Sequence, residues 1–173
     1  MANKATLLDK IPEETRDRLR ALTSATEDFE WPGSLARRQG WLVANRAYHA
    51  VQRMLGKQEM VELLDELGLR RPLPAELARE ALLAAVELYL HIDEAAGEVQ
   101  DLGDCIDIAI SRCPAYSQFE RSNSNIPPCG CFARIYGWHD ALGSSSDVEM
   151  TGNLKWGDAA CRMRLHWPRD AET

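Results

Sequence analysis

The sequence lacks long hydrophobic runs and an excess of positive charge. None of its 173 residues belongs to a run approaching the ~18 apolar residues of a spanning helix, which argues against a membrane-spanning protein. The net charge of −7 and the scattered arginines would repel phosphate groups, so we expect no nucleic-acid partner and no membrane partner. The charged N-terminus lacks the apolar stretch of a secretory signal, which predicts a cytoplasmic location.

Several well-known catalytic signatures are also missing. The chain contains no G-x-S-x-G, no Walker-type phosphate loop, no H-E-x-x-H and no Rossmann fingerprint. These absences disfavour serine-hydrolase and nucleotide-driven chemistry, and we expect no cofactor. No internal repeat or second hydrophobic nucleus divides the chain. We therefore predict a single domain over residues 1–173, with a helical half at 1–102 and a cysteine-bearing sheet half at 103–173.

The first half has the apolar periodicity of helices. Because Trp31-Pro32-Gly33 is a helix breaker, we expect a helix from Ser34 to Leu55 that Gly56 terminates. A short helix should follow from Met60 to Leu67, ended by Gly68. The stretch from Ala75 to Ala96 carries a broad apolar stripe, which predicts a central buried helix.

The second half alternates like a half-buried sheet. Residues 105–110 and 160–167 each place apolar side chains at every second position, and residues 148–154 form a third expected strand. The last two strands should form a hairpin, with Cys161 pointing inward. We expect a turn at 97–103 and a helix at 129–142 that is interrupted at Gly137. The fold class is therefore α+β, with helices packed on a small antiparallel sheet.

The cysteines are the chemically unusual feature. All five follow residue 104, at Cys105, Cys113, Cys129, Cys131 and Cys161. A thiol at a loop or helix start is favoured as a thiolate nucleophile, and His139 could serve Cys129 or Cys131 as a base. The alternative is that cysteines are small apolar core side chains, which we favour for Cys105 and Cys161 and weigh equally with chemistry for Cys113 and the Cys129-Gly130-Cys131 pair.

A metal site is a further interpretation of the same residues. Cys113, Cys129 and Cys131, with Cys161 or His139, would offer the soft ligands that zinc prefers. Structural zinc sites usually pair ligands as C-x₂₋₄-C, whereas this chain has C-x-C at 129–131. The spacing therefore disfavours zinc, and we expect no metal.

Three short motifs occur in a familiar order. A strand runs into Cys113-Pro114 with an aromatic residue, Tyr116, two positions on; a cysteine then precedes a helix; and Gly157-Asp158-Ala159-Ala160-Cys161 opens the last strand. Over residues 104–167 this order resembles the L-2-amino-thiazoline-4-carboxylic acid hydrolase family. The Gly-Asp-x-x-Cys motif alone also resembles vinyl-reductase-type ligand-binding domains.

The resemblance implies hydrolysis of a small cyclic, thiazoline- or amidine-like carboxylate in a specialised metabolic pathway. On this hypothesis a thiolate attacks or orients the ring, His139 or Asp140 handles the proton, and Arg134 pairs with the substrate carboxylate. The candidate catalytic residues are Cys113, Cys129, Cys131, His139 and Cys161. The candidate substrate-binding residues are Arg134, Tyr116 and Asp140.

A second hypothesis is a protein without catalytic activity. An apolar pocket between the helices and the sheet would bind a small molecule, with Cys161 and Cys113 lining it, in a sensor or carrier. Either hypothesis makes a small molecule the partner. The sequence leaves the oligomeric state open, with a homodimer as one option.

Overall fold

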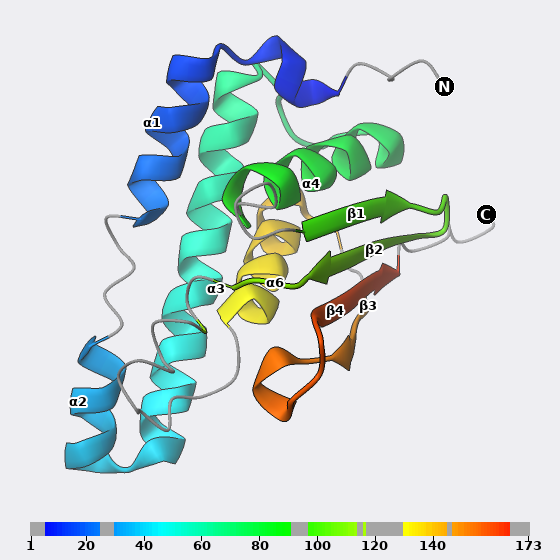
Figure 1. The fold of residues 1–173 in the computed structure, drawn as a ribbon. Helices are drawn as coiled ribbons and strands as arrows, with labels where there is room; N and C mark the ends of the chain where they lie inside the picture. Colours follow the sequence, from blue (N-terminus) through cyan, green and yellow to red (C-terminus); the bar gives the residue numbers. More distant parts are fainter. Residues whose placement is uncertain are drawn as a thin grey trace.

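The computed structural model describes residues 6–24, 30–90, 97–113, 116, 130–144 and 147–166. Helices lie against one face of a four-stranded antiparallel sheet, as Figure 1 shows. The expected α+β class, with a C-terminal hairpin, is confirmed. Among the described helices, none is long and apolar enough to cross a membrane.

The N-terminal region is helical. A 3-10 turn at Leu7–Lys10 (η1) leads into α1 (Glu13–Ser24), and α2 (Glu30–Gln39) is followed by the long helix α3 (Trp41–Glu66). In Figure 1, α1 lies beside one end of α3 and α2 beside the other. Leu7, Leu8, Ile11 and Leu19 are buried, so this region contributes to the core.

The expected break at residues 31–33 is wrong. Trp31-Pro32-Gly33 lies inside α2, where Pro32 is at the third helical position and therefore lies in the first turn. The chain breaks instead at Gly40, whose φ of 86° favours glycine. Helix α3 then continues through Gly56 and ends before Gly68. The helix expected from Ser34 is therefore divided at Gly40, and its second part is continuous with the one expected at Met60–Leu67.

Helix α4 (Ala75–Tyr89) is the buried helix that the apolar stripe predicts. Eight of its residues are buried, including Leu82, Val86 and Leu88. Residues 91–96, which complete the expected helix, lie outside the described residues. The next segment, Gly97–Asp101, is strand β1 and not the expected turn. Its single apolar side chain, Val99, gives little strand signal, because β1 is an edge strand with both faces largely exposed.

The sheet has the order β1-β2-β4-β3. Strand β2 (Cys105–Ile110) pairs with β4 (Cys161–His166), and β4 pairs with β3 (Asp147–Gly152). Ile106, Ile108 and Ile110 are buried as predicted. On β4, Cys161, Met163 and Leu165 are buried, while Arg162 and His166 are exposed. One face of the sheet therefore packs on the helices, and the alternation is confirmed.

Helix α6 (Gly130–Leu142) packs along α3 with backbones in close contact. A methyl group on Gly56 of α3 would lie 2.1 Å from the Arg134 carbonyl oxygen, and one on Gly137 of α6 would lie 2.1 Å from the Arg53 carbonyl oxygen. These glycines let the two helices approach each other closely. Helix α6 is continuous through Gly137, so the expected interruption there is wrong. One hydrophobic cluster joins α1, α3, α4, α6 and the sheet.

Candidate functional site

The Gly-Asp-x-x-Cys motif forms the connection between β3 and β4. Gly157 has φ 91° and ends a 3-10 turn over Leu154–Trp156 (η2). The carboxylate of Asp158 accepts a hydrogen bond from the Asn153 N–H at 2.7 Å, and the Asn153 side chain accepts one from the Lys155 N–H at 2.9 Å. The glycine and aspartate of this motif therefore have a structural reason, because they close a tight turn.

Cys161 completes the same turn. Its thiol is buried, and its Sγ accepts a hydrogen bond from the Leu154 N–H at 3.4 Å. Burial raises the pKa of the Cys161 thiol, and the Leu154 N–H opposes only part of that increase. Cys161 is therefore a neutral thiol at physiological pH, which suits a lining or core group better than a nucleophile.

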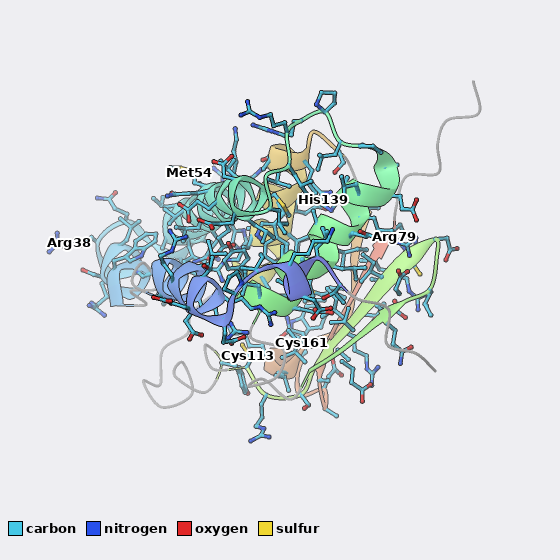
Figure 2. The ribbon with its side chains drawn as sticks, turned by 90° about the horizontal axis from the view of Figure 1, so that it is seen from above. Arg38, Met54, Arg79, Cys113, His139 and Cys161 are labelled. Atoms are coloured by element: carbon cyan, nitrogen blue, oxygen red, sulfur yellow. The ribbon has the colours of Figure 1, made fainter. Side chains whose placement is uncertain are left out.

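Two further candidate cysteines lie near Cys161. Cys131 is in the first turn of α6, and its thiol adds to the rise in the Cys161 pKa, so the two side chains lie within electrostatic range. Cys113 follows β2 at the end of the sheet where Ile110 pairs with Cys161, and Figure 2 shows Cys113 and Cys161 at the same end. Tyr116 is half-buried. Cys129 and Pro114 lie outside the described residues.

His139 does not accompany these thiols. It lies eight residues after Cys131 on α6, which is about 12 Å along the helix axis, and Figure 2 shows it far from Cys113 and Cys161. Its Nδ1 lies 3.0 Å from the Ser144 hydroxyl oxygen. Burial lowers the pKa of His139 to about 4, so the imidazole is neutral at pH 7.

Asp140 also has a partner of its own. Its carboxylate accepts two hydrogen bonds from Arg53 of α3, at 2.6 and 2.7 Å, and these bonds lower the Asp140 pKa. The adjacent side chains of His139 and Asp140 thus point to different surroundings, as residues one apart on a helix do. Their expected part in proton transfer stays a prediction.

Arg134 faces the protein interior. Its guanidinium Nε lies 3.5 Å from a carboxylate oxygen of Glu59, and both side chains are more than nine-tenths buried. The other Glu59 oxygen accepts a 2.8 Å hydrogen bond from the Trp138 indole N–H, and the Tyr89 hydroxyl donates to the Glu59 carbonyl at 3.0 Å. In this structure Arg134 meets a protein carboxylate, so its pairing with a substrate carboxylate stays a prediction.

Glu59 was not among the residues singled out from the sequence. A glutamate within an amphipathic helix usually faces solvent, and nothing in its local sequence marks it as buried. Helical periodicity could have identified it, because Glu59 lies between Gly56 and Leu63 on the buried face of α3. Such a residue needs a partner from another helix, which α6 supplies.

A surface cleft lies between α3 and α6. Its volume is about 410 Å³, and its lining combines three residues from each helix, namely His49, Ala50, Arg53, Phe132, Ala133 and Tyr136. The rings of Phe132 and Tyr136 meet edge to face with centroids 5.4 Å apart, and the Arg53 guanidinium lies 5.9 Å from the Tyr136 ring centroid. Within the described chain, the buried Nε2 of His49 has no hydrogen-bond partner.

The geometry offers little for a metal ion. Within the described ranges, no group of three or more His, Cys, Asp or Glu side chains is arranged to hold one. Cys129 lies outside those ranges, so this result bears only on the other candidate zinc ligands, which are Cys113, Cys131, Cys161 and His139.

Comparison with known proteins shows similarity to solved structures and not to a known family. No family model matches the chain, and no curated protein matches it. The chain is similar to an H-NOX protein from Shewanella woodyi, whose solution structure is of the IWP-051-bound Fe(II)CO state. The TM-score is 0.43 at 16% identity, covering 96% of this chain and 92% of that chain. At these values the likeness carries no conclusion about function.

Proposed function

We propose that this protein binds a small, planar, largely apolar molecule as a sensor or carrier. The observation that carries the proposal is the cleft between α3 and α6. Its volume of about 410 Å³ falls within the range typical of small-molecule sites. This cleft lies between two helices, and the pocket expected between the helices and the sheet stays a prediction.

The lining of the cleft favours a ring with one polar group. Phe132 and Tyr136 offer aromatic surfaces for stacking, and the two alanines leave room beside them. Asp140 neutralises Arg53, so the cleft offers no free positive charge for an anionic ligand. The Nε2 of His49 would gain a partner from a hydroxyl or N–H group on the ligand.

The thiols support binding more than catalysis. The Cys161 thiol is neutral in the turn formed by the Gly-Asp-x-x-Cys motif. His139, the proposed base, lies about 12 Å along the α6 axis from Cys131. A thiol nucleophile needs a base within hydrogen-bond reach or surroundings that favour the thiolate. Cys161 has neither among its described neighbours, and its turn explains its position without chemistry.

Titration with phenol and indole tests the proposal. Two-dimensional ¹⁵N NMR of the full chain should show saturable shifts at Ala133, Tyr136 and His49, whereas benzoate should bind at least fivefold more weakly. His49→Phe should weaken phenol binding severalfold, because it removes the hydrogen-bonding nitrogen and keeps the ring. Ala133→Leu should abolish binding by filling the cleft. Ala47→Leu, on α3 outside the cleft, is the matched control, and shifts unchanged by Ala133→Leu would contradict the proposal.

The hydrolase hypothesis is the second candidate. One observation favours it: Cys113, Cys131 and Cys161 converge at one end of the sheet, and Cys131 lies in the first turn of a helix. Unpaired backbone N–H groups at a helix start favour a thiolate. Cys131 would then be the nucleophile that attacks the C=N carbon of a small ring.

Alkylation with iodoacetamide separates the two candidates. A catalytic Cys131 should react fast near pH 7 in the native protein, and peptide mass analysis would locate the label. Cys161 should react only after unfolding, which provides an internal standard. If Cys131 reacts no faster than a small-molecule thiol at the same pH, the hydrolase candidate fails and the binding proposal is untouched.

A further inference from the structure

One segment of this acidic protein carries positive charge without any negative charge. Residues 31–58 contain five arginines or lysines and no aspartate or glutamate, although the whole chain has a net charge of −7. The cations are Arg37, Arg38, Arg46, Arg53 and Lys57. The segment spans α2 and the first two thirds of α3, so the charges gather on one part of the molecule.

The cations lie beside exposed apolar side chains. Arg46, Arg53 and Lys57 follow one another at steps of seven and four residues, which puts them on one stripe of α3. Val43, Ala50 and Met54 have the same steps and form the neighbouring stripe. All six residues are exposed. Arg53 is ion-paired with Asp140, so Arg37, Arg38 and Arg46 are the cations that we assign to an anionic partner. A basic edge beside an apolar edge is typical of helices that lie on anionic surfaces.

The corner between α2 and α3 extends this face. Three consecutive apolar residues, Trp41, Leu42 and Val43, are exposed there, and Leu42 keeps 66% of its surface accessible. Met54, which follows Val43 on the same stripe of α3, keeps 71%. Figure 1 shows the α2–α3 corner at one extremity of the molecule, and Figure 2 shows Arg38 projecting outward from it. Apolar groups at a protruding corner can reach a flat partner without obstruction.

We propose that this corner, together with the outer face of α3, docks the protein onto anionic lipid membranes. Charge complementarity identifies the partner as anionic, and the exposed apolar side chains of Leu42 and Val43 beside the cations favour a membrane, because they can insert among lipids. The protein would lie on the membrane without crossing it. This revises the expectation of no membrane partner, which rested on the overall charge and the absence of a spanning run.

Co-sedimentation of the full chain with vesicles tests the proposal. The protein should bind vesicles of phosphatidylcholine with 30% phosphatidylserine at least tenfold more tightly than pure phosphatidylcholine, and 0.5 M NaCl should release it. Replacing Arg37, Arg38 and Arg46 by glutamine should weaken binding by about fivefold for each arginine removed. Leu42→Ser with Met54→Gln should also weaken it, because these side chains insert.

Matched controls remove general effects of charge and hydrophobicity. Arg162→Gln changes an exposed arginine on the sheet, and Leu102→Ser changes a leucine that is 52% exposed in the β1–β2 turn. Both variants should bind anionic vesicles as the wild type does, and circular dichroism should show all variants folded. Equal binding to both vesicle types, or equal losses in the controls, would overturn the proposal. Binding to poly-glutamate but not to vesicles would assign the face to an acidic polypeptide instead.

Discussion

His139 and Asp140 show how strongly the surroundings of a residue set its chemistry. The imidazole of His139 is buried and its pKa is lowered to about 4, whereas the Asp140 carboxylate at the surface is held ionised by Arg53. The two residues are adjacent on α6. Burial dominates the pKa shift of His139, whereas the hydrogen-bonded guanidinium of Arg53 dominates that of Asp140. Each group also acts on the pKa of the other, with a smaller effect than these largest causes.

Acid should destabilise the protein through His139. Above pH 6.5 the imidazole is neutral in both the folded and the unfolded chain, so it contributes no pH dependence. As the pH falls from 6.5 to 4, only the unfolded chain takes up the proton, and the free energy of unfolding should drop by about 3 kcal/mol. Urea unfolding at a series of pH values measures the drop. His139→Gln should flatten the profile in this window.

The buried ion pair of Glu59 and Arg134 should be asymmetric to mutation. Glu59→Leu leaves the Arg134 guanidinium inside the protein without this carboxylate, and we expect a loss of about 3 to 5 kcal/mol. The double variant Glu59→Leu with Arg134→Met should recover part of that loss, because an apolar pair replaces two buried charges while the buried Trp138 N–H still lacks its Glu59 acceptor. Chemical denaturation of both variants gives the comparison. A double variant that is as unstable as the single one would show that the charges themselves are needed.

At the scale of the elements, two glycines determine how α3 and α6 meet. Gly56 and Gly137 each lie against a carbonyl oxygen of the other helix, at distances that leave no room for a methyl group. Glycine inside a helix is unfavourable by roughly 1 kcal/mol relative to alanine, so these positions are explained by the contact and not by helix formation.

Gly56→Ala should therefore destabilise the protein despite its better helix propensity. The new methyl group would overlap the Arg134 carbonyl, and overpacking of this kind costs about 1 to 3 kcal/mol, here at the upper end. Gly33→Ala in α2 is the control, because its nearest neighbour is the Arg37 side chain at 3.8 Å. That variant should be neutral or slightly stabilising. Thermal unfolding of the two variants would reveal the opposite signs.

At the scale of the whole molecule, stability should be uneven across the sheet. Strands β2 and β4 have neighbours on both sides and carry the buried isoleucines, Met163 and Leu165, whereas β1 is an edge strand with largely exposed side chains. Amide hydrogen exchange should be slowest in β2, β4 and α4 and clearly faster in β1. Equal protection of β1 and β2 would contradict this order.

The sequence predicted elements where burial is regular and failed where contacts with other elements decide. The alternation at residues 105–110 and 161–166 identified two strands and their inward faces, because one buried face imposes a period of two. Gly56, Gly137 and Pro32 were interpreted as breaks, although two of them serve the α3–α6 contact and the third lies in a first turn. Strand β1 was missed because an edge strand needs few apolar residues.

The roles of the candidate site residues stay predictions, and the structure adds where the described ones lie. The sequence pointed to Cys113, Cys131 and Cys161, which the structure places near one end of the sheet, and to the Gly157-Asp158 motif. It could not show that Arg134 would meet Glu59, or that His139 would lie beside Ser144, because these pairs join residues far apart in sequence or depend on the end of α6.

The sequence by itself determined the fold class, the alternating core of the sheet and the absence of acidic residues between residues 31 and 58. These properties are local, since periodicity and charge depend only on the types and spacing of residues along the sequence. Only the tertiary structure decided which apolar residues of α3 are covered. Ala44 and Tyr48 are buried by neighbouring elements, whereas Leu42 and Met54 remain exposed on the same helix. Burial is a property of the partners that pack around a helix, and the local sequence of the helix does not contain them.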